Sequence, residues 1–445
     1  MKTFSKGGIH PDPSKLTAGM PIEGVRTPSV VRLLLSQHIG VPAKCIVKPK
    51  QVVAAGEKIA EAGGFVSAAV HTPVAGVVRK IELVRDGQGL WKEAVVIDAA
   101  ESPESPSTLC FDESSPVRNE ADIAALSAQE IIDIVGEAGI VGLGGASFPT
   151  RVKLSIPEGK SADVFVINGA ECEPYLTCDD ALMRAWPDRI LRGVALLMRA
   201  AGTKKAVVGI ESNKPEAIKA MKSAARKFEG IEVETLKTAY PQGSEKQLIY
   251  ALTGRTVPAG GLPVDAGVVV DNVATAFAVD RAVRFGEPLT KRVATVTGPA
   301  VTRPGNYIVC AGMSAGELME HAGGVPENTG KVIAGGPMMG RAMSCTDSPL
   351  VKSSGGILVL PEDMSRRGEE RACMRCGGCL NAGPMGLEPY LLQTLGEFGK
   401  AEEARGHGVL NCLECGSCSY VCPSHRPVLD YIRLAKQMVR TLPRK

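Results

Sequence analysis

Two short loops near the end of the chain hold seven of its 13 cysteines, at spacings that could bind iron. The second loop, CLECGSCSYVCP, has C-x2-C-x2-C-x3-C-P spacing, with cysteines at Cys412, Cys415, Cys418 and Cys422. Three thiolates this close can converge on one face of an iron–sulfur cluster, while the cysteine before the proline ligates the other cluster of a two-cluster domain. A zinc ribbon is the alternative, but structural zinc prefers paired C-x2-C knuckles. The loop therefore predicts iron–sulfur chemistry.

The first loop, CMRCGGCLNAGPMG, lacks the cysteine expected before its proline. Cys373, Cys376 and Cys379 have the C-x2-C-x2-C spacing, but Gly383 stands before Pro384. With crossed ligands, the first cluster is complete on Cys373, Cys376, Cys379 and Cys422. The second cluster has only Cys412, Cys415 and Cys418.

Three states of the second cluster are open. It can be a three-iron cluster, a four-iron cluster whose last iron is held by water, a histidine or a carboxylate, or an empty site. His407 and His425 flank the second loop, although each is more simply a surface residue. Of the scattered cysteines, Cys172 is more simply a small buried side chain than a ligand.

A glycine-rich segment, GIVGLGGASFPT at 139–150, could let a planar or phosphorylated group approach the backbone closely. It follows a helix that begins at Ser127, where S-A-Q-E forms a capping box. A dinucleotide fingerprint instead follows a strand. The segment is therefore a ligand loop of another kind.

The elements around this loop predict a parallel, Rossmann-like sheet. Strands are expected at 163–168, 206–210 and 231–236, with helical stretches at about 180–200 and 214–228. This βαβαβ order is typical of a parallel sheet covered by helices. Residues 293–345 change to short strands and one helix, an α+β module, and from about 366 the chain is helical between cysteine loops.

Residues 25–100 alternate short β-branched runs with glycine and proline, which predicts a small all-β module. Its hairpin VHTPVAGVVRKIE (70–82) is similar to that of lipoyl and biotinyl carrier domains, but Phe65 stands where carriers place the modified lysine. We therefore expect a barrel-sandwich packing module without a swinging arm. The Ser- and Pro-rich stretch 101–122 reads as a linker.

Composition narrows the class of protein. Fifty-one basic and 48 acidic side chains leave a net charge of +3, which does not favour nucleic acid as a partner. No apolar run reaches the roughly 20 residues of a membrane span, and no signal peptide is apparent. We expect a protein of the cytoplasm. Its basic end, RLAKQMVRTLPRK, is either a solvated helix end or a contact to an anionic membrane or a partner.

Two segments carry a family resemblance. GLGGASFPTRVK (142–153) resembles the flavin loop of the NADH-oxidising subunit of respiratory complex I, and VINGAECEP (166–174) resembles its next flavin-contacting segment. Together with further motifs, these segments make nearly the whole chain resemble the C subunits of Rnf electron-transport complexes, which are ion-translocating ferredoxin:NAD+ oxidoreductases. The further motifs are GGIH (7–10), HTPVAG, YPQGSEKQ (240–247), TGRTVPAGGLPVDAGVVVDNVAT (253–275), an SLBB-like GPAVTRPGNYIV (298–309) and the two cysteine loops.

The resemblance implies noncovalent FMN, two iron–sulfur clusters and NAD(H) as substrate, and it assigns site residues by position. Those implied to take part in the chemistry are Phe148, near the nicotinamide, Lys153, Glu173 and Glu245. Those implied to bind the cofactor are Gly142, Gly144, Gly145, Asn168, Glu171, Tyr240, Gly243, Ser244, Asn272 and Thr275. Ala170 departs from the complex I pattern, which has an acid there. A bulky residue at Gly144 is expected to overlap the flavin ring, and Glu171 and Glu173 are expected to favour NADH over NADPH.

The expected fold is a multidomain α/β plus β chain. Its parts are a barrel-sandwich module (1–105), a linker (106–122), an FMN/NAD(H) domain (123–290), an SLBB-like module (291–346), a connector (347–365) and a ferredoxin-like domain (366–445). The implied protein is a peripheral oxidoreductase subunit on the cytoplasmic face of the cell membrane, with other subunits of the complex as partners. The related microcompartment cobalamin reductase and a docking scaffold without turnover are the alternatives, and the N-terminal β module favours the Rnf family over the reductase.

Overall fold

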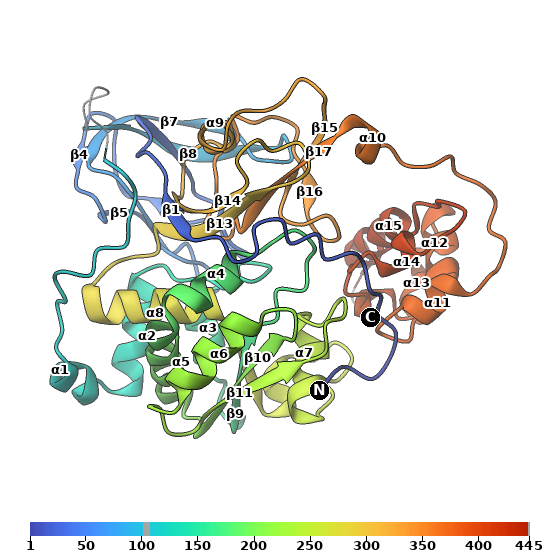
Figure 1. Ribbon diagram of the computed structural model, residues 1–445, viewed down its shortest axis with the longest axis horizontal. Helices are drawn as coiled ribbons and strands as arrows, with labels where there is room; N and C mark the ends of the chain where they lie inside the picture. The colour runs from blue at the N-terminus through green and yellow to red at the C-terminus, as the bar shows by residue number, and fades with distance from the viewer. Residues whose placement is uncertain (101–106, 444–445) are drawn as a thin grey trace.

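The computed structural model describes residues 1–100 and 107–443 (Figure 1). The start of the expected linker, 101–106, and the last two residues of the basic tail lie outside the described residues. Among the described residues, no helix is both long and apolar enough to cross a membrane.

The N-terminal module is all-β, as predicted, and consists of two small antiparallel sheets. One has the order β2-β8-β7-β4, from Val30–Leu34, Trp91–Ala99, Gly76–Arg85 and Val52–Val53. The other has the order β3-β5-β6, from Lys44–Cys45, Lys58–Glu61 and Val70–His71. Buried Val31 and Leu33 alternate with less buried residues along β2, the pattern of a strand with one face in the core. Phe65 is 75% exposed.

The central domain contains the predicted parallel sheet, in the order β11-β10-β9-β12. Its strands are Ile231–Leu236, Lys205–Glu211, Val164–Gly169 and Val268–Asn272. Three consecutive buried residues of β9, Phe165, Val166 and Ile167, enter the cores on both faces. A continuous apolar run of this kind is typical of a parallel strand covered on both sides.

Helices cover both faces of this sheet. They are α1 (Glu120–Ala125), α2 (Ala128–Glu137), α3 (Thr150–Leu154), α4 (Cys178–Ala185), α5 (Pro187–Ala201), α6 (Pro215–Ala225), α7 (Glu245–Thr253), the 3-10 turn η1 (Pro263–Ala266) and α8 (Val273–Phe285). Ser127 caps α2 in the predicted box with Glu130. Helices α5 and α8 pack closely because Gly193 has no side chain; a Cβ there would lie 1.8 Å from the carbonyl oxygen of Ala276.

The described part of the expected linker is held against the central domain. The ring of Phe111 packs edge-on against Trp186 and Phe277, with centroids 5.6 and 5.0 Å apart. Helix α1 begins at Glu120, within the stretch read as linker. Residues 107–119 contain no helix and no named strand, as expected of a connecting segment, although Phe111 anchors them to the central domain. Residues 120–122 of the predicted linker belong to helix α1 instead.

A six-stranded sheet follows, in the order β1-β14-β13-β17-β15-β16. Its strands are Ile22–Gly24, Gly305–Cys310, Lys291–Thr297, Gly356–Pro361, Thr329–Ala334 and Arg341–Ala342, and its helices are α9 (Ala315–His321) and α10 (Glu362–Ser365). The expected connector 347–365 is corrected here, because its run GILVLP forms β17 between β13 and β15. Strand β1 reaches this sheet from the N-terminus and pairs with β14. Buried residues of this sheet and of the β module form one core.

The C-terminal domain is helical between cysteine loops, as predicted, and stands to one side of the other modules (Figure 1). Its elements are α11 (Gly378–Ala382), α12 (Pro389–Glu397), α13 (Ala401–Gly406), the 3-10 turn η2 (Val409–Asn411), α14 (Ser417–Tyr420) and α15 (Val428–Thr441). Residues 433–441 of the basic segment belong to α15, and this helix packs Ile432, Ala435 and Val439 into the domain's core. Its described part is therefore a packed helix end.

Candidate functional site

Two asparagines form a polar floor at the carboxyl edge of the parallel sheet. Asn272 ends β12 opposite Asn168 of β9. Its amide nitrogen donates to the Asn168 carbonyl at 3.2 Å and to the Asp179 carboxylate at 2.8 Å, while its side-chain oxygen accepts from the Ala274 amide and caps α8. Burial raises the pKa of Asp179 to about 6, with a further increase from Glu171. Ligands of open α/β sheets bind at this edge.

The glycine loop lies over this floor. The Leu143 amide donates to the Thr275 hydroxyl at 3.0 Å, and the Gly142 amide donates to the Phe148 carbonyl at 2.9 Å. A Cβ on Gly144 would lie 2.8 Å from the Asn272 amide nitrogen, whereas a Cβ on Gly145 would meet nothing within 4 Å. Gly145 thus faces open space, and the half-buried Phe148 ends the loop.

Charged groups flank the floor. Lys153 donates to the Val270 carbonyl at 3.0 Å and lies 3.6 Å from the buried Asp271 carboxylate. Glu245 is exposed at the start of α7, and Ser244 precedes it as the N-cap residue without a side-chain capping bond. The second Asp271 oxygen has no hydrogen-bond partner. A polar ligand could therefore still be recognised here.

Glu171 and Glu173 are both occupied by protein groups. The Glu171 carboxylate accepts from the amides of Asp179 and Asp180, at 2.7 and 3.2 Å, at the start of α4. The Glu173 carboxylate accepts from the amides of Met338 and Met339, at 3.1 and 2.7 Å. Burial raises the pKa of Glu173. Neither carboxylate is free for a ribose, so the expected basis for NADH selectivity is not found in this arrangement.

Residues 240–247, the YPQGSEKQ segment, contact both the asparagine floor and the cysteine loop 412–423. Asn168 donates to the Gly243 carbonyl at 2.8 Å, and the Gly243 amide donates to the Cys172 sulfur at 3.3 Å. Burial raises the pKa of Cys172 to about 12, as for a packed thiol. Tyr240 is buried and turned away from the floor, because its hydroxyl donates to the Cys415 carbonyl at 2.8 Å. Its predicted role in cofactor binding has no contact to support it.

Sequence reasoning missed two buried lysines beneath the loop after β9. Lys214 donates to the Ala170 carbonyl at 2.7 Å. Lys15 donates to the carbonyls of Glu171, Glu173 and Leu176, at 2.9, 2.8 and 2.5 Å. Burial lowers the pKa of Lys15. No local pattern marks either lysine, since their acceptors lie far away in the sequence.

The residues present fit a flavin phosphate and ring. Exposed backbone at Gly144, Gly145 and Ala146 lies above the amide-rich floor. Besides the second Asp271 oxygen, the buried side-chain nitrogen of Gln242 and the hydroxyl of Thr150 have no hydrogen-bond partner among the described residues. Open glycine backbone beside unpaired polar groups is what a bound polar cofactor requires.

A second site is a cavity of about 30 Å³ in the C-terminal domain. It is lined by Cys412, Cys415, Cys418 and Gly383, and otherwise mostly by apolar side chains such as Leu387, Leu392, Leu429 and Ile432. Gly383 is the position at which the sequence predicted the missing fourth ligand of this cluster, and it does line the cavity. Neither His407 nor His425 lines the cavity. Three convergent thiols around one space fit an iron–sulfur cluster.

The other cysteine set lies on the outer side of the domain. Cys373 and Cys376 are exposed, and Cys379 and Cys422 are partly buried. The two loops meet where the Arg371 amide donates to the Ser424 carbonyl and the Ser424 hydroxyl to the Ala372 carbonyl, both at 3.0 Å. This contact brings the start of the first loop beside the end of the second.

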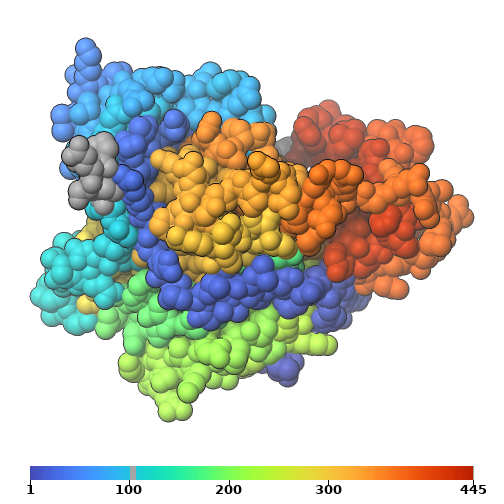
Figure 2. Space-filling model, turned by 45° about the horizontal axis from the view of Figure 1, so that its top comes forward, coloured from blue at the N-terminus to red at the C-terminus, as the bar shows by residue number. Residues whose placement is uncertain are grey.

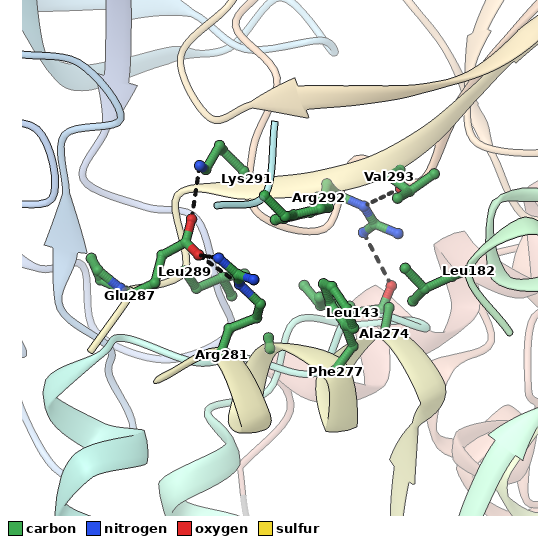
Figure 3. Close-up of a pocket in the computed structure, with 13 residues that line it drawn as sticks. Leu143, Leu182, Ala274, Phe277, Arg281, Glu287, Leu289, Lys291, Arg292 and Val293 are labelled. Carbon is green, nitrogen blue, oxygen red and sulfur yellow. Dashed lines mark hydrogen bonds and ion pairs between the residues drawn. The ribbon is translucent and has the colours of Figure 1, made fainter. Parts of the chain in front are cut away.

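A further cavity, between α8 and β13, is structural (Figure 3). Its volume of about 20 Å³ is enough for a water molecule, and its lining contains no cysteine and no glycine. Glu287 pairs there with Arg281 and Lys291, and Arg292 donates to the Leu143 carbonyl at 3.3 Å. Arg292 thus supports the glycine loop from behind.

Four family models match the chain in order. They are described as the RnfC barrel sandwich hybrid domain (residues 3–102), the Nuo51 FMN-binding domain (135–281), the SLBB domain (293–342) and the 4Fe-4S dicluster domain (365–423). This order matches the predicted module order.

Curated relatives match almost the whole chain. The C subunit of the proton-translocating ferredoxin:NAD(+) oxidoreductase complex of Clostridium ljungdahlii is 45% identical over 98% of this chain and 94% of its own. The Na(+)-translocating counterpart of Acetobacterium woodii is 40% identical over 99% and 98%. The C subunit of the ion-translocating oxidoreductase complex of Rhodobacter capsulatus is 40% identical over 98% and 83%. A solved NAD+-reducing [NiFe]-hydrogenase is 21% identical over 70% of this chain and 62% of that one, with a TM-score of 0.49, which is too weak to add to the relatives.

Proposed function

Because this chain belongs to the family of C subunits of ion-translocating ferredoxin:NAD(+) oxidoreductase complexes, we propose that it exchanges electrons between NAD(H), FMN and iron–sulfur clusters. The observation that carries this proposal is a single segment, residues 240–247, that contacts both sites. Gly243 accepts from Asn168 of the polar floor, and Tyr240 donates to Cys415 of the cysteine cavity.

The chain's own residues would hold and orient the reactants. A bound flavin supplies two-electron chemistry with nicotinamide and one-electron chemistry with clusters. The Asn168 side chain and the amides of the glycine loop would hold it, Asn272 would keep the floor beneath it in place, and Lys153 would offer a positive charge. Phe148 would keep the nicotinamide in place and exclude water.

A three-iron cluster is our proposal for the site on Cys412, Cys415 and Cys418. The cavity lining includes no histidine or carboxylate, and a water ligand needs polar neighbours that an apolar lining does not supply. The thioether of Met385 also lines the cavity, but its sulfur is only a weak acceptor. Cluster type sets the reduction potential, and we expect this three-iron cluster to be easier to reduce than a four-cysteine, four-iron cluster in the same place.

Addition of NADH to anaerobic protein tests the function. We expect the flavin absorbance to bleach. A docking scaffold without turnover would keep its absorbance unchanged. The cobalamin reductase alternative is disfavoured, because the RnfC barrel sandwich hybrid model matches residues 3–102 and the relative from Clostridium ljungdahlii matches 98% of the chain.

We propose that the protein prefers NADH to NADPH, and this proposal rests on the family resemblance alone. With Glu171 and Glu173 occupied, exposed Glu245 is the remaining implied carboxylate that could accept a ribose hydroxyl and repel a 2′-phosphate. Glu245→Gln should raise the rate of flavin reduction by NADPH relative to NADH. Equal wild-type rates with the two nucleotides would contradict the preference.

We propose that the protein is peripheral and lies on the cytoplasmic face of the membrane, held by other subunits. The relatives are named as C subunits of ion-translocating complexes, which supports other subunits of such a complex as partners. Washed membranes should release the chain at high salt without detergent, whereas release only by detergent would contradict peripheral attachment.

A further inference from the structure

We infer that the ligand-deficient cluster site, on Cys412, Cys415 and Cys418, is the inner one, which exchanges electrons with the flavin directly, and that Tyr240 is the residue that positions it. This inference rests on the proposed function. It adds an order to the two clusters: the set on Cys373, Cys376, Cys379 and Cys422 is the outer one.

Tyr240 joins the flavin-side loop, residues 240–247, to the inner cysteine loop, residues 412–423. Its side chain is 1% exposed, and its hydroxyl donates to the Cys415 carbonyl at 2.8 Å. Three residues later, Gly243 contacts Asn168 and Cys172 of the polar floor. Only a short, buried stretch of chain therefore separates the floor from Cys415.

The N-terminal segment fixes this junction. Ile9 and Tyr240 exchange two backbone hydrogen bonds, at 2.8 and 2.9 Å, and the Gly8 amide donates to the Ala382 carbonyl at 3.0 Å. A Cβ on Gly7 would lie 2.5 Å from the Gly383 carbonyl oxygen. Figure 2 shows this segment as a blue band that runs between the green and yellow regions to the red domain. It ends against the corner where the inner cluster lacks its cysteine.

Two more contacts hold the inner site against the central α/β domain, which contains the proposed flavin site. Gln247, in α7, donates to the Pro384 carbonyl at 2.9 Å, directly after Gly383. Glu173 accepts from the Met338 amide, and the Met338 carbonyl lies 3.0 Å from where a Gly416 Cβ would stand. Ile9, Tyr240, Ala382 and Cys415 are buried together in one apolar cluster.

Of the outer cysteine set, Cys379 lies three residues before Ala382, which meets the N-terminal segment, but among the described residues no hydrogen bond joins Cys373 or Cys376 to the central domain. Cys373 and Cys376 are exposed. The hydrogen bonds described for the flanking Arg371 and Ala372 go to Ser424 of the same domain. An exposed cluster is suited to exchange with a partner protein, whereas a buried one at an internal junction is suited to exchange with the flavin.

The electron count is consistent with this order. Reduction of one NAD+ takes two electrons and one proton, and each cluster passes one electron at a time. Cys373, Cys376, Cys379 and Cys422 would hold the cluster that faces a partner, and Cys412, Cys415 and Cys418 would hold the cluster beside the flavin. Bound in this order, the clusters would supply single electrons, and the flavin would supply the pairing of two electrons with a proton that hydride transfer to NAD+ requires. Oxidation of NADH would run in reverse.

The test compares Cys418→Ala, which removes an inner ligand, with Cys376→Ala, which removes an outer ligand. Each protein is reduced with dithionite, freed of the reductant and mixed with NAD+ before freeze-quench EPR. We expect the outer cluster of Cys418→Ala to stay reduced over the time in which the wild-type outer cluster is oxidised. The inner cluster of Cys376→Ala should be oxidised as fast as in the wild type. Outer-cluster oxidation at the wild-type rate in Cys418→Ala would overturn the order.

Tyr240→Phe keeps the packing and removes only the hydroxyl, so it guards against a folding artefact. We expect a shift in the midpoint potential and EPR line shape of the inner cluster alone, because its loop loses a hydrogen bond. A shift of the outer cluster alone, or of neither cluster, would overturn the positioning role. Flavin bleaching by NADH in the same wild-type sample separates the two claims, since its failure would contradict the proposed function.

Discussion

Gly144 and Gly145 are neighbours in the glycine loop, but a side chain would meet different surroundings at each. At Gly144 it would clash with the side chain of Asn272, which caps α8. A bulky residue at Gly144 would therefore collide with the protein itself, whereas the sequence predicted a collision with the flavin ring. At Gly145 it would point into open space. Gly145 is therefore the better probe of cofactor binding.

Gly145→Leu should leave the fold intact and lose most of the bound flavin, because the added side chain would occupy cofactor space. Flavin content per chain and circular dichroism of the purified variant measure the two effects. Gly406→Leu is a matched control, since a Cβ there also meets nothing within 4 Å, in the distant α13. Wild-type flavin content in Gly145→Leu would contradict the loop assignment.

Gly383→Cys should complete the inner cluster. Gly383 has φ −69° and ψ 114°, which any residue adopts, and a Cβ there would meet its nearest neighbours at 3.4 Å. We expect the oxidised wild-type protein to give the EPR signal of a three-iron cluster, and the variant to lose it and gain iron. Two identical four-cysteine signatures in the wild type would contradict the assignment.

Several residue roles could not be predicted from the sequence. The family pattern identified Asn168, Asn272 and the glycine loop, which the structure brings to one edge. It could not show that backbone amides of Met338 and Met339 donate to the Glu173 carboxylate, because these donors lie in another module. The donors to Glu171 lie in the same domain, at the start of α4.

At the scale of elements, Lys352 joins three parts of the chain. It precedes β17, is buried, and donates at 2.6 Å to the carbonyls of Ala69 in the β module and Gly139 after α2. Burial lowers the pKa of Lys352 from 10.5 to about 7. Above pH 7 the unfolded chain therefore holds a proton that the folded chain lacks, so stability rises with pH up to about 10.5.

Lys352→Met should cost about 2–4 kcal/mol, because two buried carbonyls lose their donor. Between pH 7 and pH 9, the wild-type melting temperature should rise relative to that of the variant. Lys204→Met, at an exposed lysine, is the control. Parallel pH dependence of wild type and Lys352→Met would contradict the pKa argument.

Local signals predicted some elements and missed others. The capping box at Ser127 and the βαβαβ rhythm depend on neighbouring residues, and both are confirmed. Strands β1 and β17 were missed because their partners, β14 and β13, lie far away in the sequence. Strand pairing over such separations leaves no local pattern.

At the scale of the whole molecule, the N-terminus connects modules that the sequence order keeps apart. Residues 7–9 contact residues 240–247 and the cluster domain. Strand β1 pairs with the six-stranded sheet (Figure 1). The module order followed from sequence patterns and the resemblance. The contacts between modules did not, because they depend on tertiary packing.

Cofactor content of anaerobically purified protein tests the central claim most directly. We expect about one noncovalent FMN and about seven iron atoms per chain, three at the inner site and four at the outer. Protein that folds and stays soluble but contains neither flavin nor iron would contradict it.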